Sequence, residues 1–307
     1  MRSGWMSVGL LGLALGCSGD GKDDGDTGHT HDEMTPFALR FAAVQDGAPV
    51  DCSTPMLGLG PDGLDTVGLS DVRFFVSDLQ LLDASGAEVE LTLDDNAFQY
   101  ANDSGRVALI DLTGDSAGDC RASAISFSEG TARTNDVVTG TTYVDQVAAV
   151  RFSVGVPQAL MQQVIGANTP EAAPSPLNEL FWSWASGYRH FVFNATVTDG
   201  VDAGEGYLHI GSTDCAAEGE LALESRDACG LLNTPLVALD GFDLAADTVT
   251  VDLAAALAGL PLTVPITDPD TQQVIGEAPG WACHSFAMQP DCPQIFENFG
   301  LDIDAGT

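Results

Sequence analysis

Six cysteines beyond residue 50 constrain this 307-residue chain more than any other feature. They are Cys52, Cys120, Cys215, Cys229, Cys283 and Cys292. No two of them have the CxxC spacing that is typical of structural zinc sites. In an exported protein, an even set of cysteines predicts disulfides, although sequence alone leaves their connectivity open. We predict Cys215–Cys229 and Cys283–Cys292, because cysteines that are near in sequence close short loops. This leaves Cys52–Cys120 as the one pair joined over a long distance in sequence.

The first 17 residues predict export. Arg2 supplies a positive charge, and residues 8–15 form an apolar run that is too short to span a bilayer. The run ends in Leu-Ala-Leu-Gly-Cys17, which resembles a bacterial lipobox. We therefore expect residues 1–17 to be a lipoprotein signal peptide and Cys17 to be lipidated; ordinary secretion is the alternative. Ser18 favours the outer membrane or cell surface, with the protein on the periplasmic or extracellular side and held through the lipid anchor only.

The chain beyond the leader divides in two by composition. Residues 18–35 are rich in glycine and aspartate, which predicts a disordered acidic tether. Residues 36–303 contain apolar runs throughout and no linker-like break, which predicts one domain of β structure.

The formal net charge is −35, and Lys22 is the only lysine. Such a charge repels nucleic acids and anionic membrane surfaces, so we expect no nucleic-acid partner. It favours cations and basic partners, but it is also typical of proteins from salty environments.

Short apolar segments separated by turn residues dominate the domain. Their spacing predicts an all-β fold, an antiparallel β-sandwich with few short helices and long loops, stapled by disulfides. Helices are predicted only at 157–165 and 254–257, and the prolines within 167–178 predict a loop. The predicted strands are 37–41, 72–76, 79–82, 89–91, 107–112, 124–127, 146–154, 191–197, 206–210, 221–224, 236–239 and 248–253.

Two tryptophans and three histidines are the candidates for chemistry. Trp182 and Trp184 are two residues apart, so on a strand they would share one face, where core packing is the alternative explanation. Soft or borderline metals such as copper favour imidazole and thioether ligands. The possible ligands are His209, His190, His284, Met161 and Met288, while His29 and His31 are expected to be solvated in the tether.

A hairpin is predicted to bring these candidates together. Asp199-Gly200 lies midway between the strands 191–197 and 206–210, which suits an antiparallel turn. We therefore expect Trp182 and Trp184 to lie close to His209. No HExxH metalloprotease motif or P-loop occurs, and we expect a protein that is not an enzyme.

Several motifs in the same order resemble the MbnP family, the four-cysteine partner of the metallo-mystery pair. The resemblance spans roughly residues 37–301. It rests on Phe-Phe-Val-Ser-Asp-Leu-Gln-Leu at 74–81, Val-Arg-Phe-Ser-Val-Gly-Val-Pro at 150–157, Phe-Trp-Ser-Trp at 181–184 with Gly-Tyr at 187–188, His-Ile-Gly-Ser-Thr at 209–213 with Cys215 and Cys229, and Pro-Gly at 279–280 with Cys283 and Cys292.

The resemblance implies a copper-binding protein whose tryptophan can be oxidised to kynurenine by a di-haem c-type peroxidase-like partner. Trp182 or Trp184 would be the modified residue, and His209 the principal ligand candidate. Two departures put the metal site in question: Leu160-Met161-Gln162 stands where an Asn-His pair is expected, and His284 where methionine is expected. The rival interpretation is a cell-surface binding or adhesion module of the same fold, without metal.

Overall fold

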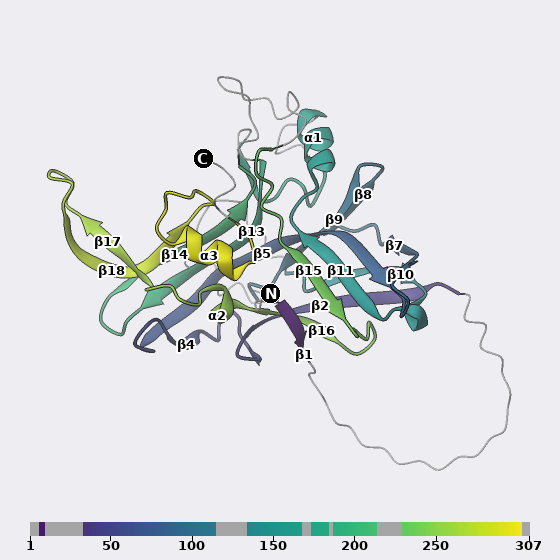
Figure 1. The fold of residues 1–307 in the computed structure, drawn as a ribbon, viewed down its shortest axis with the longest axis horizontal. Helices are drawn as coiled ribbons and strands as arrows, with labels where there is room; N and C mark the ends of the chain where they lie inside the picture. Colours follow the sequence, from purple (N-terminus) through teal and green to yellow (C-terminus); the bar gives the residue numbers. More distant parts are fainter. Residues whose placement is uncertain are drawn as a thin grey trace, which may run out of the picture.

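The fold is a sandwich of two β-sheets (Figure 1). The computed structural model describes residues 6–9, 33–114, 134–167, 173–183, 187–213 and 229–302. The predicted all-β class is confirmed. Most strand pairs are antiparallel, but β14 with β18 and β16 with β2 are parallel. No helix in these ranges is long and apolar enough to cross a membrane.

The smaller sheet has six strands in the order β1-β16-β2-β10-β7, with β3 beside β2. Their bounds are β1 Met6–Gly9, β2 Thr35–Gln45, β3 Ala48–Pro49, β7 Leu91–Leu93, β10 Val137–Thr142 and β16 Thr248–Asp252. The edge strand β1 falls within the predicted signal peptide. Residues 10–32, which include Cys17 and most of the predicted tether, lie outside the described ranges.

The larger sheet has twelve strands, with a central path β15-β11-β5-β13-β14-β18-β17. Beside this path, β4, β6 and β9 pair with β5, β8 pairs with β9, and β12 pairs with β13. The bounds are β4 Met56–Leu59, β5 Asp65–Leu82, β6 Glu88–Val89, β8 Gln99–Asn102, β9 Gly105–Asp111, β11 Ala149–Val154, β12 Phe181–Ser183, β13 Gly187–Thr198, β14 Ala203–Gly211, β15 Leu236–Asp240, β17 Thr263–Thr267 and β18 Val274–Cys283.

Strand β5 joins two predicted strands into one of 18 residues. The two predicted segments, 72–76 and 79–82, are continuous because Asp78 adopts a φ of 50° without ending the strand. This residue interrupts the alternation of apolar side chains, and the pairing with β11 shifts register opposite it. The prolines at 265 and 279 concealed the β17–β18 hairpin, which extends from the body at the left of Figure 1.

Helices are short, as predicted. They are α1 Gln158–Ala167, α2 Leu253–Ala256 and α3 Cys292–Asn298, with a 3-10 turn at Val144–Gln146. The sequence predicted the first two and missed α3. The predicted strands 124–127 and 221–224 lie outside the described residues.

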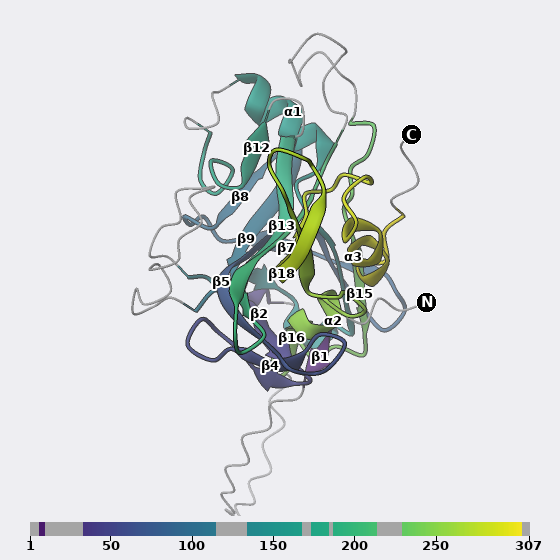
Figure 2. The same ribbon diagram turned by 90° about the vertical axis from the view of Figure 1, so that its left-hand side faces the viewer.

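The main core lies between the sheets. Phe41 of β2 contacts Phe74 of β5 and Phe152 of β11 edge to face, with ring centroids 5.7 and 5.8 Å apart. A second apolar cluster, which includes Phe75 and Val192, lies on the outer face of the larger sheet. Figure 2 shows α1 and β12 on that side of the molecule, opposite the smaller sheet.

One of the three predicted disulfides is fully within the described residues. Cys283 and Cys292 are bonded, with Cα atoms 4.9 Å apart. Cys52 and Cys229 are also disulfide-bonded, but their predicted partners, Cys120 and Cys215, lie outside the described ranges. The pairing Cys283–Cys292 is therefore confirmed, and the other two pairings stay predictions.

Candidate metal site

The hairpin of β13 and β14 positions the candidate residues. Its turn is held by Asp199 Oδ1, which accepts hydrogen bonds from the Val201 and Asp202 amides, and Gly200 takes a φ of 91°. Across the hairpin, Val192 is paired with His209 and Asn194 with Tyr207. The antiparallel hairpin expected from the sequence is thus observed.

The alternation of side chains along the hairpin directs His209 away from the main core. Phe191 and Phe193 of β13, with Leu208 of β14, belong to the core between the sheets. His209 is the next residue after Leu208, so it faces the outer side of the larger sheet, where Val192 belongs to the second apolar cluster.

A second histidine reaches the same place from the C-terminal part of the chain. β18 runs parallel to β14, with Cys283 beside Leu208, and Cys283 faces the main core. The following residue, His284, therefore turns outward. Its backbone amide donates to Gln289 Oε1 (2.6 Å), and its Nδ1 lies 2.8 Å from Nδ1 of His209.

The two histidines differ in their surroundings. His209 is 2% exposed, and its Nε2 lies 2.8 Å from Oδ1 of the fully buried Asn194. Burial, followed by the charge of Arg189 and by His284 and Arg73, lowers the pKa of His209 to about 2. His284 is only partly buried, and burial and Arg189 lower its pKa as well. Both rings are therefore neutral near pH 7, the state in which imidazole can bind a metal.

Aromatic side chains surround the histidine pair. The Trp182 ring lies edge-on to His209, with centroids 6.2 Å apart, and 6.4 Å from His284. Phe286 lies 5.8 Å from Trp182, and Tyr207 lies 5.9 Å from His284. The Tyr207 hydroxyl donates to Glu205, which raises the pKa of Tyr207 to about 12.

Gly211 makes room for Trp182. A Cβ atom at residue 211 would lie 3.1 Å from the indole ring and 2.6 Å from the carbonyl oxygen of Tyr188. Ser285 links the same segment to His284: its Oγ accepts from the Gly211 amide and donates to the His209 carbonyl. The expected proximity of Trp182 to His209 is thus observed, while Trp184 lies outside the described residues.

The other predicted ligands lie in different settings. His190 is fully buried, its Nδ1 accepts from the Val156 amide (3.2 Å), and burial lowers its pKa to about 4. Met161 is buried with its sulfur 3.9 Å from Ser212 Oγ, and Met288 is 91% exposed. Among the described residues, no group of three or more His, Cys, Asp or Glu side chains could hold a metal ion. The histidine pair is therefore the part of the predicted ligand set that the fold brings together.

Buried charges lie beside the pair on the same sheet. Arg73 of β5 lies opposite Val192. Its Nε and Nη2 each donate to a carboxylate oxygen of Asp71 at 2.6 Å, and its Nη1 donates to Glu179 at 3.2 Å. Glu179 lies in the segment that leads into β12, so this ion pair ties the segment that carries Trp182 to the central strand. Burial lowers the pKa of Arg189 to about 10.

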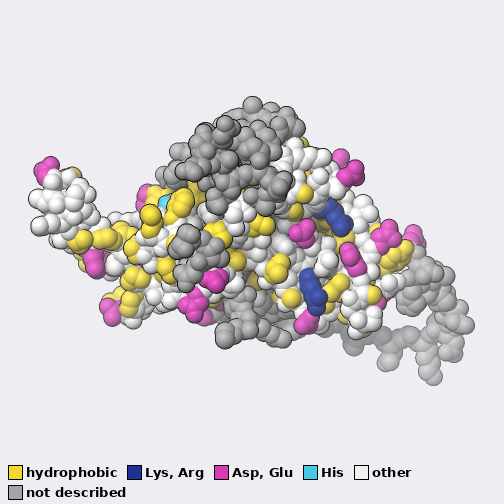
Figure 3. Space-filling model, turned by 45° about the horizontal axis from the view of Figure 1, so that its top comes forward, with side chains coloured by type: hydrophobic (Ala, Val, Ile, Leu, Met, Phe, Trp, Pro, Cys, Tyr) yellow, Lys and Arg dark blue, Asp and Glu magenta, His cyan; other side chains and the backbone are white. Residues whose placement is uncertain are grey.

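The surface near the pair is apolar within an acidic protein. Phe286 is 46% exposed, and Figure 3 shows a histidine at the surface beside hydrophobic side chains, with carboxylates around them. Thus the pair has one accessible side, through His284.

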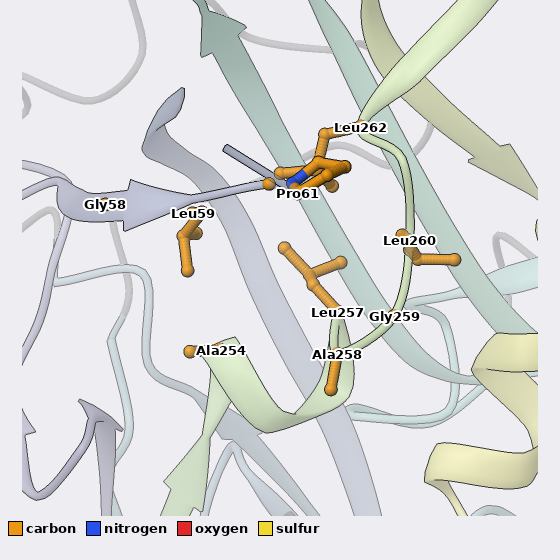
Figure 4. Close-up of a pocket in the computed structure, with 10 residues that line it drawn as sticks. Gly58, Leu59, Pro61, Ala254, Leu257, Ala258, Gly259, Leu260 and Leu262 are labelled. Atoms are coloured by element: carbon orange, nitrogen blue, oxygen red, sulfur yellow. The ribbon is translucent and has the colours of Figure 1, made fainter. Parts of the chain in front are cut away.

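A glycine pattern that is typical of dinucleotide-binding sites occurs beside an apolar hollow elsewhere in the molecule. Residues 58–63 have GxGxxG spacing. The first four of them, with α2 and the residues after it, line a hollow of about 290 Å³ (Figure 4). The dinucleotide fingerprint requires a helix after the glycines, whose N-terminus binds the pyrophosphate. Here strand β5 follows, so the pattern does not form that site.

A second sequence pattern is similar to the motif around the nucleophilic serine of many hydrolases. Residues 114–118 read Gly-Asp-Ser-Ala-Gly, which has the GxSxG spacing of hydrolase nucleophiles. That motif depends on a sharp turn from a strand into a helix. Only Gly114, which follows β9, lies within the described residues. The pattern therefore does not support a hydrolase nucleophile.

Comparisons with known proteins agree with the sequence motifs. The family model described as MbnP matches residues 34–274. The solved structure of MbnP from Methylosinus trichosporium is similar, with a TM-score of 0.65 and 28% sequence identity, over 88% of this chain and 90% of that one. No curated protein matches the chain.

Proposed function

Because the chain belongs to the MbnP family, we propose that it is an exported protein that binds copper as cargo between His209 and His284. The observation that carries this proposal is the distance of 2.8 Å between their Nδ1 atoms. Metal–imidazole bonds are about 2.0–2.1 Å long, so two ligands of one ion lie less than about 4 Å apart. Copper is among the metals for which imidazole is a suitable ligand.

The departure at residue 284 supports the same assignment. The resemblance leads us to expect methionine after Cys283, but a histidine stands there and contacts His209. The residue pair expected after Pro157 is absent, and Leu160 and Met161 are buried in the second apolar cluster. We propose that His284 supplies the second nitrogen ligand in this chain and that His190 is structural.

Trp182 is the proposed substrate of the haem partner. Conversion of tryptophan to kynurenine breaks the C2–C3 bond of the indole and leaves one oxygen atom on each of the two carbons, a four-electron oxidation that would consume two molecules of hydrogen peroxide and release two of water. Hydrolysis of the N-formyl group then releases C2 as formate. A di-haem c-type peroxidase-like protein would react with the peroxide and pass the oxidising equivalents to the indole. The aryl amine formed would lie beside both imidazoles, because the Trp182 ring is close to each. In this function the protein is a carrier and a substrate of its partner, not a catalyst.

Copper content tests the ligand assignment. Protein purified from its native host should contain copper, and His209→Ala and His284→Ala should each lower the copper-to-protein ratio. Met288→Ala is the matched control, because this exposed side chain is the other type of copper ligand and should leave the ratio unchanged. Equal copper in all four proteins would contradict the assignment. Mass spectrometry of the same samples reads the state of Trp182 and Trp184.

Location is a separate part of the proposal. We propose that Cys17 carries the lipid and holds the protein at the outer membrane or cell surface. Cys17→Ala should release the protein from membranes. An unaltered protein that is already free of membranes and begins at another residue would contradict it.

The alternative is a binding or adhesion module without metal. Phe286, which is exposed and lies 5.8 Å from Trp182, and the exposed Met288 favour a contact surface. In that case, His209→Ala should lower the free energy of unfolding while the native protein contains no copper. Measuring metal content and unfolding on one sample separates the two functions.

A further inference from the structure

The ring nitrogen of His209 that faces away from His284, Nε2, determines which tautomer the ring adopts. Asn194 is completely buried on β13, and its Oδ1 lies 2.8 Å from Nε2 of His209. A carboxamide oxygen can only accept a hydrogen bond, so this contact requires a proton on Nε2. A neutral ring with that proton has its lone pair on Nδ1, the atom that faces His284.

No other hydrogen bond of the Asn194 side chain is seen among the described residues. Its Nδ2 is buried and has no hydrogen-bond partner among the described residues. A buried donor without a partner costs about 1–3 kcal/mol. An apolar side chain of similar size would avoid this cost, so the contact with His209 is the reason that the structure offers for an asparagine here.

We propose that Asn194 is a positioning residue that fixes His209 in the Nε2–H tautomer and so keeps the Nδ1 lone pair directed at the ion-binding position. This inference rests on the proposed copper function and assigns the nitrogen through which His209 would bind. His284 needs no such residue: it is partly exposed, and its ring can exchange tautomers through solvent. In the metal-free pair, His284 Nδ1–H donates to His209 Nδ1.

The first test reads the tautomer without any metal. In ¹⁵N-labelled, metal-free full-length protein, a long-range ¹H–¹⁵N spectrum should show His209 protonated at Nε2. Asn194→Leu should move His209 toward the Nδ1–H form, and Asn194→Asp, which keeps an acceptor oxygen, should preserve the original pattern. His190 is an internal reference, because its Nδ1 accepts the Val156 amide in every variant. Wild-type protein with His209 protonated at Nδ1, or no change in Asn194→Leu, would overturn the proposal.

The second test measures copper(II) affinity by competition with a chromophoric chelator. Loss of a residue that orients a metal-binding histidine typically costs about 10–100-fold in affinity. We expect a loss of this size in Asn194→Leu and a much smaller one in Asn194→Asp, with near-ultraviolet circular dichroism confirming that both are folded. A changed tautomer with unchanged affinity would overturn the role of Asn194. Absence of copper binding in the wild type would overturn the proposed function, and the metal-free spectrum would still decide the tautomer.

Discussion

At the scale of single residues, buried neutral histidines make stability depend on pH. Burial lowers the pKa of His190 to about 4, whereas an unfolded chain has a histidine pKa near 6.5. Between these values the unfolded chain binds a proton that the folded chain does not. The contribution of the neutral histidine to the free energy of unfolding is therefore fully present above pH 6.5. It is lost as the pH falls toward the folded-state pKa, by up to about 1.4 kcal/mol per pH unit for one such group.

His190→Gln should remove this contribution. Its free energy of unfolding, measured in urea at pH 7 and pH 5, should fall less between the two values than that of the wild type. His209 contributes to the same trend in both proteins, so the difference between them isolates His190. An equal fall in both proteins would mean that His190 is not held neutral.

Gly211 tests the packing of Trp182. Gly211→Ala places a methyl group against the indole and the Tyr188 carbonyl, and such overpacking typically costs about 1–3 kcal/mol. Tryptophan fluorescence should change with the lower stability. Gly276→Ala on β18 is the control, because its added Cβ would meet only Ile266 at 3.7 Å. Equal effects at the two glycines would contradict a specific contact at residue 211.

At the scale of elements, the Cys283–Cys292 disulfide joins the end of β18 to the start of α3. Replacing both cysteines by serine should lower the free energy of unfolding by about 2–4 kcal/mol. Because His284 follows Cys283 directly, copper content should fall too. Chemical denaturation and metal analysis of the double variant check both effects, and unchanged copper content would show that Gln289 and Ser285 hold His284 without the bond.

The elements that could be predicted are those with local signals. Asp199-Gly200 marks the turn that pairs β13 with β14, and Gly86, with a φ of 84°, marks the turn that pairs β5 with β6. The parallel pairing of β14 with β18 has no such signal, because its strands are distant in sequence. His284 was available as a candidate beside Cys283, but its contact with His209 depends on that pairing. Asn194 was missed, since an asparagine within an apolar strand gives no indication of what it faces.

At the scale of the whole molecule, the net negative charge lowers the stability of the compact folded state. With 45 acidic and 10 basic residues, repulsion destabilises the folded state, and salt screens it. The melting temperature should rise by several degrees from low salt to physiological ionic strength, equally in sodium and potassium chloride. A melting temperature independent of salt would show that the carboxylates are already spaced widely enough to avoid repulsion.

His209 and His284 are 75 positions apart and meet only because β18 lies beside β14. A chain that emerges from its amino end first carries one imidazole long before the other. Until the last strand has docked, the pair does not exist, and a truncated or half-assembled chain has one ring where the finished protein has two. Copper retention would therefore indicate that β18 has docked beside β14 and that folding is complete.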